Sequence, residues 1–448
     1  MVGLVCGSVG AANVGRSDPT GCSMCPHTPP VSKIFDVRDY GAVGDGVTVN
    51  TKAIQAAITD AAAKGGGLVT LTDGRYLTGG IVLRDYVYLN VTTSAALIAS
   101  SSPSDYPQNK TSAWVVVYGY QCRFCGIVGG GVLDGNATPG FLKNYHLSFD
   151  QLQPVTWTGP SHGGCKGECR PKLVVFQEAD MVLVANVVLH DSADWTSRYF
   201  NSTNILITNV TVLGSHYWPN NDGIDPDSSQ NITISNVWVE TGDDGICPKT
   251  TPGALPLHNL LVANATIRSR SSAIKLGSAT AMDMSHMLFS NILVLADSNR
   301  GLGIQHRDAG NIFDVEFRDV TIRGTSLNPY DWWGDGEAIW ITTIARESGS
   351  TVGTVSDIRF VRVMASNVVN GAFLSSKTQT PITKLLIQDS SIQTVPIHPL
   401  TLKQGVTYSP LGHDYRPAPN GLDIVPWPLT GLYLEHVNGA VLDSLNLS

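Results

Sequence analysis

Two short acidic phrases between residues 220 and 249 carry the residue types that could do chemistry. The first reads Asn-Asp-Gly-Ile-Asp and the second reads Gly-Asp-Asp-Gly-Ile, and a strand-like run separates them. Asp222 and Asp244 occupy matching positions, and Asp243 adjoins Asp244. If the two phrases lie side by side, three carboxyl groups meet in one site.

Carboxyl groups held this close raise one another's pKa, because two like charges in one site resist ionising together. One group can then stay protonated as a general acid while another stays ionised as a base, which is the division of labour that glycoside hydrolysis requires. A single Asp in such a turn usually only caps the turn. Calcium is the other alternative, since it favours clustered carboxylates. We expect Asp222, Asp243 and Asp244 to be catalytic, with no metal and no cofactor.

A repeated strand pattern would position these residues. From about residue 173, similar apolar phrases start roughly 24 to 28 residues apart, a spacing typical of solenoids. The phrases begin at Met181, Asn204, Asn231, Asn259, Met287, Asp314, Asp357 and Lys384. Units this short cannot bury an apolar face without stacking on each other. We predict an all-β chain folded as a right-handed parallel β-helix, in preference to a propeller or a sandwich.

One short α-helix is predicted near the N-terminus, from Thr51 to Lys64. Asn50 or Thr51 would cap it, apolar residues recur at helical spacing within it, and three glycines end it. We expect this helix to cover the open end of the coil. Residues 1–33 read as an irregular segment, and residues 34–448 as a single β-helix catalytic domain.

Each turn also carries a second strand phrase centred on isoleucine. If these isoleucines stack inward, the next residues form an outer ladder, and the residues two positions earlier form a column at the strand entrance. The expected ladder is Asp225, Cys247, Lys275, Gln305 and Trp340. The expected column is Asp222, Asp244, Ser272, Leu302 and Glu337.

Composition narrows the class of protein. The net charge of −8 and the absence of any basic run argue against nucleic-acid binding. No apolar run reaches the roughly 18 residues that a membrane span requires. Asn-X-Ser/Thr sequons indicate a secreted glycoprotein, although asparagine also serves turns; they lie at Asn90, Asn109, Asn136, Asn201, Asn209, Asn231, Asn264 and Asn446.

Eight cysteines include two CxxC pairs, Cys22/Cys25 and Cys122/Cys125. The pairs could form a four-cysteine zinc site, but no zinc-ribbon context surrounds them, and we favour disulfides in loops. Cys165 and Cys169 flank a glycine-rich loop where they could pair locally. We interpret Cys247 as a buried thiol.

The sequence resembles glycoside hydrolase family 28, the polygalacturonase group, over about residues 34–445. The resemblance rests on FDVRDYGAVGDG, on GIVGGGVLDG at 126–135, on Arg170-Pro171, on DWT at Trp195, and above all on the two acidic phrases. It implies a parallel β-helix and inverting hydrolysis of a pectin-like polysaccharide by a secreted enzyme, which we expect to be a monomer. It also implies that Asp243 is the general acid and that Asp222 and Asp244 activate water. Inversion predicts carboxyl groups roughly 6.5–9.5 Å apart.

The sequence departs from the family pattern on the following turns. The family usually carries a Gly-His-Gly phrase on the next rung, where this sequence has Ser272. One rung later the family carries an Arg-Ile-Lys phrase that holds an acidic sugar, and this sequence has Gly303 and Gln305 in those places. Lys275 or Arg307 could compensate, with Lys275 at the ladder position of the missing lysine, one rung earlier, unless it is a solvated surface lysine. The residues expected to bind substrate are Lys275, Arg307, Gln305, Trp195, Arg198, Trp333 and Glu337.

An insertion from Pro329 to Glu337, with two tryptophans, suits stacking on sugar rings and could close one end of the groove, favouring cleavage from chain ends. It could equally be a hydrophobic plug on the side of the coil. Two other functions remain open. A polysaccharide lyase on the same fold would use calcium and a basic residue, Lys275 or Arg307. A non-catalytic β-helix would only bind glycans.

Overall fold

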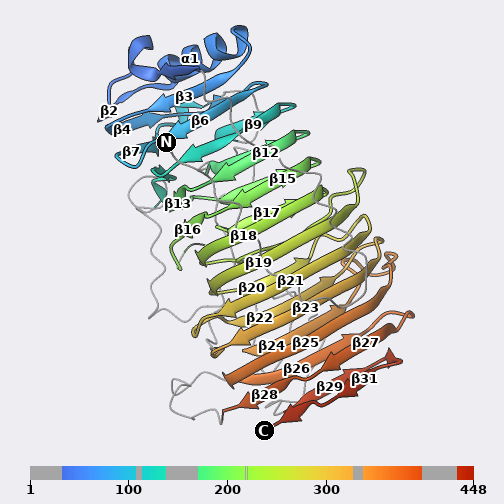
Figure 1. Cartoon of the computed structure of the whole chain (residues 1–448). Coiled ribbons are helices and arrows are strands. Elements are labelled where there is room, and N and C mark those ends of the chain that lie inside the picture. The colour runs from blue at the N-terminus through green and yellow to red at the C-terminus, as the bar shows by residue number, and fades with distance from the viewer. Residues whose placement is uncertain are drawn as a thin grey trace, which may run out of the picture.

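The strands stack as successive turns of a solenoid (Figure 1). The computed structural model describes residues 33–106, 114–137, 170–216, 218, 220–325, 336–395 and 431–448. Within these residues the strands of each turn pair in parallel with those of the next turn, which confirms the predicted right-handed parallel β-helix. The expected change from an irregular segment to the coil near residue 33 falls at the edge of the described residues and stays a prediction.

The predicted helix is present as α1 (Thr51–Ala63), with Lys64 at its C-cap. Asn50 is the N-cap residue, but its side chain does not cap; its amide instead bonds the backbone of Val43 at 2.6 and 2.9 Å. The buried face of the helix consists of Ile54, Ala57, Ile58 and Ala61. These residues pack at the N-terminal end of the coil (Figure 1), so the helix covers the open end as expected. Two short 3-10 helices are η1 (Val37–Tyr40) and η2 (Pro103–Asp105).

The strands of the described residues form three sheets. The largest bends around two faces of the coil and has 22 strands: β1 (Ile34–Asp36), β2 (Asp45–Val49), β3 (Gly67–Leu71), β4 (Gly74–Thr78), β6 (Val87–Val91), β7 (Ala95–Ala99), β9 (Arg123–Gly129), β10 (Val132–Asp134), β12 (Asp180–Ala185), β13 (Val188–His190), β15 (Thr203–Thr208), β16 (Thr211–Leu213), β18 (Gln230–Thr241), β19 (Leu257–Ser269), β21 (Met284–Val294), β23 (Ile312–Ile322), β25 (Val355–Val368), β27 (Ile382–Gln388), β28 (Ser391–Thr394), β30 (Val437–Asn438), β31 (Val441–Asp443) and β32 (Asn446–Leu447).

The remaining face carries two smaller sheets of five strands each, again within the described residues. The first contains β5 (Ile81–Val82), β8 (Val115–Tyr120), β11 (Lys172–Gln177), β14 (Ser197–Phe200) and β17 (Ile224–Asp227). The second contains β20 (Ser272–Gly277), β22 (Arg300–His306), β24 (Glu337–Thr343), β26 (Asn370–Ser376) and β29 (Leu432–Glu435). Among the described residues, isolated bridges join the segment between the two sheets to its neighbours: Ile246 pairs with Ile224 on one side and Ile274 on the other, and Lys249 pairs with Asp227. The second acidic phrase forms this interrupted rung.

Residues in the left-handed conformation mark the start of each repeat. Met181, Asn204, Asn231, Asn259, Asp314, Asp357 and Lys384 all have φ between 53° and 58°, and His286 takes this role just before Met287. Asparagine tolerates this conformation better than most residues. Its amide also stacks from turn to turn: Asn231 Nδ2 donates to Asn204 Oδ1 at 3.1 Å, and Asn259 Nδ2 donates to Asn231 Oδ1 at 3.0 Å. This ladder explains why so many repeats begin with asparagine.

The interior is a continuous apolar core of stacked side chains. Phe289, Phe317 and Phe360 on three successive turns stack with ring centroids 4.8 and 5.1 Å apart. Ile224, Ile246 and Ile274 are fully buried, as predicted for inward isoleucines. Stacking in this way fixes the register of each turn and therefore the position of the side chains outside it.

The register corrects the predicted ladder and column by two residues on β22 alone, and it confirms Trp340 on the ladder and Glu337 on the column one rung later. Ile274 pairs with Leu302, so Lys275 lies beside Gly303, and Gln305 lies beside Gly277. Leu302 points into the core, and the column of strand entrances continues instead from Ser272 to Arg300 and Glu337. Leu302 and Ile304 both face inward, so the alternating pattern fits either choice, and our choice of Ile304 was wrong.

Candidate active site

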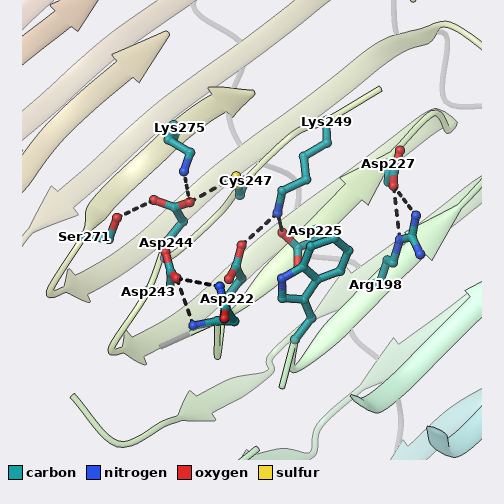
Figure 2. A network of polar contacts seen from close by, with 12 residues as sticks. Arg198, Asp222, Asp225, Asp227, Asp243, Asp244, Cys247, Lys249, Ser271 and Lys275 are labelled. Atoms are coloured by element: carbon teal, nitrogen blue, oxygen red, sulfur yellow. Dashed lines mark hydrogen bonds and ion pairs between the residues drawn. The ribbon is translucent and has the colours of Figure 1, made fainter. Parts of the chain in front are cut away.

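The three aspartates of the acidic phrases meet, as the sequence predicts. Asp222 precedes β17, and Asp243 and Asp244 follow β18, which places them on adjacent rungs (Figure 2). All three are buried, with 1 to 3% of their surface exposed, and one carboxyl oxygen of each lies within 4.8 Å of the others. These closest oxygens are nearer than the 6.5–9.5 Å expected for inverting enzymes, so distance alone does not indicate inversion.

Asp243 lies in surroundings that favour its protonated form. Its Oδ2 accepts from the backbone N–H of Asn220 at 2.9 Å, and its Oδ1 accepts from the N–H of Asp244 at 3.0 Å. Burial raises the pKa of Asp243 to about 8, and the neighbouring charges of Asp222 and Asp244 add to the effect. Near neutral pH this carboxyl group holds a proton that it can donate.

Asp244, in contrast, lies in surroundings that favour its ionised form. Its Oδ2 pairs with the Lys275 ammonium group, its Oδ1 accepts from Ser271 Oγ at 2.8 Å, and the backbone N–H of Ser272 lies 3.3 Å away. Burial would raise the pKa of Asp244, but the charges of Lys275 and Lys249 and these hydrogen bonds outweigh it and lower the pKa below its ordinary value. Asp244 is therefore ionised beside a protonated Asp243.

Lys249 connects Asp222 to a fourth carboxyl group, that of Asp225. Its Nζ lies 2.8 Å from Asp222 Oδ2 and also contacts Asp225 Oδ1. Burial disfavours the charged form of this lysine, but Asp222 and Asp225 outweigh the effect and raise the pKa of Lys249 well above its ordinary value. The other oxygen of Asp222, Oδ1, is buried and has no hydrogen-bond partner among the described residues.

Buried lysines thus balance the acidic cluster. The sequence offered only a catalytic task or a metal ion as compensation for the repulsion between the aspartates, but Lys249 and Lys275 supply two positive charges inside the site. Carboxyl oxygens of Asp222, Asp243 and Asp244, and ligand atoms of Asp222, Asp225 and Cys247, lie close enough to hold a cation. In both groups a lysine ammonium already contacts at least one of the oxygens that calcium would need.

Lys275 is close to the three aspartates, but its surroundings differ from those predicted. It is 2% exposed and ion-paired with Asp244, so it is neither a solvated surface lysine nor at the ladder position of Gln305. Cys247 is a buried free thiol as predicted, 3.1 Å from the carbonyl oxygen of Gly277 and 3.5 Å from Asp244 Oδ2.

Trp195 and Arg198 also lie at this site. The half-buried Trp195 ring has the Nζ of Lys249 at 4.4 Å and the Nζ of Lys172 at 4.7 Å from its centroid. The Arg198 guanidinium lies 5.1 Å from the same ring and bonds Asp227 at 2.5 and 3.1 Å. Trp195 is therefore next to the lysine that holds Asp222.

The other predicted substrate-binding residues lie further along the coil. Gln305 is buried on β22, two rungs beyond Asp244, and the N–H of Arg307 just after β22 donates to Thr280 Oγ1 at 3.1 Å. Glu337 on β24 is ion-paired with Arg300 at 3.1 Å. Trp333 lies outside the described residues.

Three residues of the site were not predicted from the sequence. Lys249, Asn220 and Arg300 contact predicted residues, but each contact joins different turns of the coil. Lys249 follows the second acidic phrase by about the length of one short strand. No other feature of the sequence indicated that it belongs to the site.

The described residues include one of the two predicted CxxC pairs. Cys122 and Cys125 form a disulfide with each other, which leaves no thiolates there for zinc; the disulfide was expected, but not its place, because Cys125 belongs to strand β9 and not to a loop. The pairs Cys22/Cys25 and Cys165/Cys169 lie outside the described residues.

Comparison with known proteins identifies the family. The model of glycosyl hydrolases family 28 matches residues 71–393, and a model described as rhamnogalacturonase A/epimerase, pectate lyase-like, matches residues 34–92. The chain belongs to glycosyl hydrolases family 28. It is a glycoside hydrolase, as the sequence predicts.

Relatives of this family 28 chain are distant. A probable polygalacturonase of Vitis vinifera is 26% identical over 79% of this chain and 73% of that protein. An exo-poly-alpha-D-galacturonosidase of Dickeya chrysanthemi is 26% identical over 66% of this chain and 56% of that protein. An exopolygalacturonase structure from Thermotoga maritima superposes with a TM-score of 0.64 and 20% identity, covering 93% of each chain, which supports the fold.

Proposed function

We propose that this family 28 enzyme hydrolyses a pectin-like polysaccharide rich in galacturonate, with Asp243 as general acid and Asp222 and Asp244 as the groups that activate water. The observation that carries the proposal is the contrast between two adjacent buried carboxyl groups: Asp244 is ion-paired with Lys275, whereas Asp243 accepts from backbone N–H groups. The relatives named as polygalacturonases supply the substrate class.

The proposed reaction uses each group once. Asp243 donates its proton to the glycosidic oxygen as the bond from that oxygen to the anomeric carbon breaks. Asp222 and Asp244 activate a water molecule: one of these carboxylates accepts one proton from it, and the water oxygen forms the new bond to the anomeric carbon. Attack from the face opposite the leaving oxygen inverts the configuration. Lys275 keeps Asp244 ionised until the water is deprotonated, and Lys249 is ion-paired with Asp222.

Asp243→Asn tests the role of the acid. The amide keeps the size of the side chain but has no acidic proton, so we expect hydrolysis of polygalacturonate to fall about 10²-fold or more. The measurement is the release of reducing ends. Asp319→Asn is the matched control, because Asp319 is paired with Arg362 on the outer face of the large sheet. Equal activity of both variants would contradict the proposal.

A lyase would give a different product. Elimination leaves an unsaturated sugar that absorbs ultraviolet light, whereas hydrolysis consumes water and leaves no double bond. We expect reducing ends to appear without this absorbance and to be insensitive to a calcium chelator. Proton NMR of the first product shows its anomeric configuration; the retained configuration would contradict inversion.

We also infer that the enzyme is a secreted glycoprotein that acts as a monomer on the plant cell wall. The disulfide between Cys122 and Cys125 supports an oxidising compartment. The sequons support it less, because Asn209, Asn231 and Asn264 already donate their Nδ2 to an asparagine on the preceding turn. No helix among the described residues is long and apolar enough to cross a membrane.

A further inference from the structure

Arg300 at the start of β22 is buried but incompletely bonded. It is 2% exposed, its Nε donates to Glu337 Oε2 at 3.1 Å, and its guanidinium lies over the Trp340 ring at 4.3 Å from the centroid. Its Nη1 is also buried and has no hydrogen-bond partner among the described residues. A buried charged donor without an acceptor is costly, so this nitrogen points to a ligand.

The register places this nitrogen in line with the catalytic aspartates. Ser272 pairs with Arg300, and the N–H of Ser272 lies 3.3 Å from Asp244 Oδ1, so Arg300 is two rungs from Asp244 on the same column. Two other side-chain atoms on this column, Asp222 Oδ1 and Ser272 Oγ, are likewise buried without partners among the described residues. Polar atoms that lack partners therefore follow one line from the catalytic site to Arg300.

Gly303 lies between Arg300 and Lys275 and places no side chain there. A Cβ added at Gly303 would lie 3.5 Å from Arg300 Cδ and 3.8 Å from Lys275 Cγ. The glycine thus sits between two cationic side chains, and Lys275 is already paired with Asp244. Arg300 offers Nη1, a buried donor that has no hydrogen-bond partner among the described residues.

We propose that Arg300 binds the carboxylate of a uronic acid residue in the sugar subsite two rungs from Asp244, and so selects an acidic polysaccharide. A guanidinium is always charged and forms strong hydrogen bonds with carboxylates. Trp340 and Glu337 hold its plane fixed, so little freedom is lost when the sugar binds. Glu337 is a positioning residue in this arrangement. The inference rests on the proposed hydrolysis and adds the residue that recognises the acidic group.

The test compares polygalacturonate with its methyl ester, which lacks the charge. Arg300→Gln would leave Glu337 as an unpaired buried charge, so the variant to make is Arg300→Gln with Glu337→Gln, which removes both charges of the pair. We expect its kcat/KM on polygalacturonate to fall about 10- to 100-fold, mainly through KM, and its kcat/KM on the ester to change less than about threefold. Arg362→Gln, on the outer face of the large sheet, is the control for net charge.

The possible results separate the two claims. An equal loss on both substrates, or no loss on either, would overturn the role of Arg300 while leaving hydrolysis established. If the unaltered enzyme cleaves neither substrate, the proposed function fails first. If the double variant does not fold, Arg300→Lys is the substitute, because lysine keeps the charge that Glu337 requires but lacks the planar fork of arginine. A larger loss of kcat/KM on polygalacturonate than on the ester supports the role of Arg300, and an equal loss overturns it.

Discussion

At the scale of single residues, two neighbouring carboxyl groups have opposite pKa shifts because they have different partners. Asp243 receives two backbone N–H groups and no cation within hydrogen-bond distance among the described residues, whereas Asp244 is paired with Lys275. Burial acts on both. The charges of Lys275 and Lys249 and the hydrogen bonds of Asp244 outweigh it at Asp244, whereas the charge of Lys275 does not outweigh it at Asp243. The acid and the base of the proposed reaction therefore differ chiefly through the direct contact of Asp244 with a lysine from the next turn.

Lys275→Met tests this dependence. Without the ammonium group the pKa of Asp244 rises, so the proton-accepting form is lost at a higher pH. We expect the acidic limb of the kcat/KM profile to shift upward and the folded state to lose about 3–5 kcal/mol, because a buried partner charge is left alone. Lys377→Met, which removes a half-exposed lysine paired with Glu435, is the control. An acidic limb that does not move would exclude Lys275 as the group that keeps Asp244 ionised.

At the scale of elements, the asparagine ladder fixes where each turn begins. Asn231 has φ 57°, donates to Asn204 and accepts from Asn259. Asn231→Ala loses both hydrogen bonds and the tolerance for this conformation, so we expect a loss of about 2–4 kcal/mol in unfolding free energy. Asn231→Gly loses only the bonds, and about half that cost is expected. Chemical denaturation measures both, and equal costs would show that conformation plays no part.

The elements also show what the sequence can and cannot predict. The inward isoleucines Ile224, Ile246 and Ile274 and the meeting of the aspartates follow from the repeat and are confirmed. The ladder residue on β22 was wrong by two positions, because alternation leaves Leu302 and Ile304 equivalent. Arg300 was missed for the same reason, because its place on the column of strand entrances depends on that register.

The sequence also did not predict which positive charges balance the buried aspartates. Lys249 and Lys275 look like ordinary strand lysines, and only the stacked turns place their ammonium groups on Asp222 and Asp244. A pattern of residue types predicts which carboxyl groups meet, but their pKa values depend on contacts between turns.

At the scale of the whole molecule, the coil is a row of turns that each contact only their neighbours. The end of such a row must be covered, and here α1 covers it with Ile54, Ala57, Ile58 and Ala61. The active site lies many turns away, on the interrupted rung between the two small sheets (Figure 1). Stability at the end and activity in the middle should therefore respond to different mutations.

Ile58→Ala tests this separation. The substitution leaves a cavity under the helix, and we expect a loss of about 2–5 kcal/mol in unfolding free energy. Activity at temperatures well below the transition should be unchanged. Lys52→Ala, on the exposed face of the same helix, is the control and should change neither quantity. A fall in kcat/KM for folded Ile58→Ala would contradict the separation.

The pH dependence of kcat/KM on polygalacturonate tests the central claim most directly. Because Asp243 must carry a proton to act as the acid, activity should fall as the pH rises through about 8, the pKa of this buried carboxyl group. Circular dichroism over the same range checks that the protein stays folded. A fall with an apparent pKa near 8 is the predicted result. Activity that stays constant up to pH 10 in folded protein would contradict the assignment of Asp243 as the general acid.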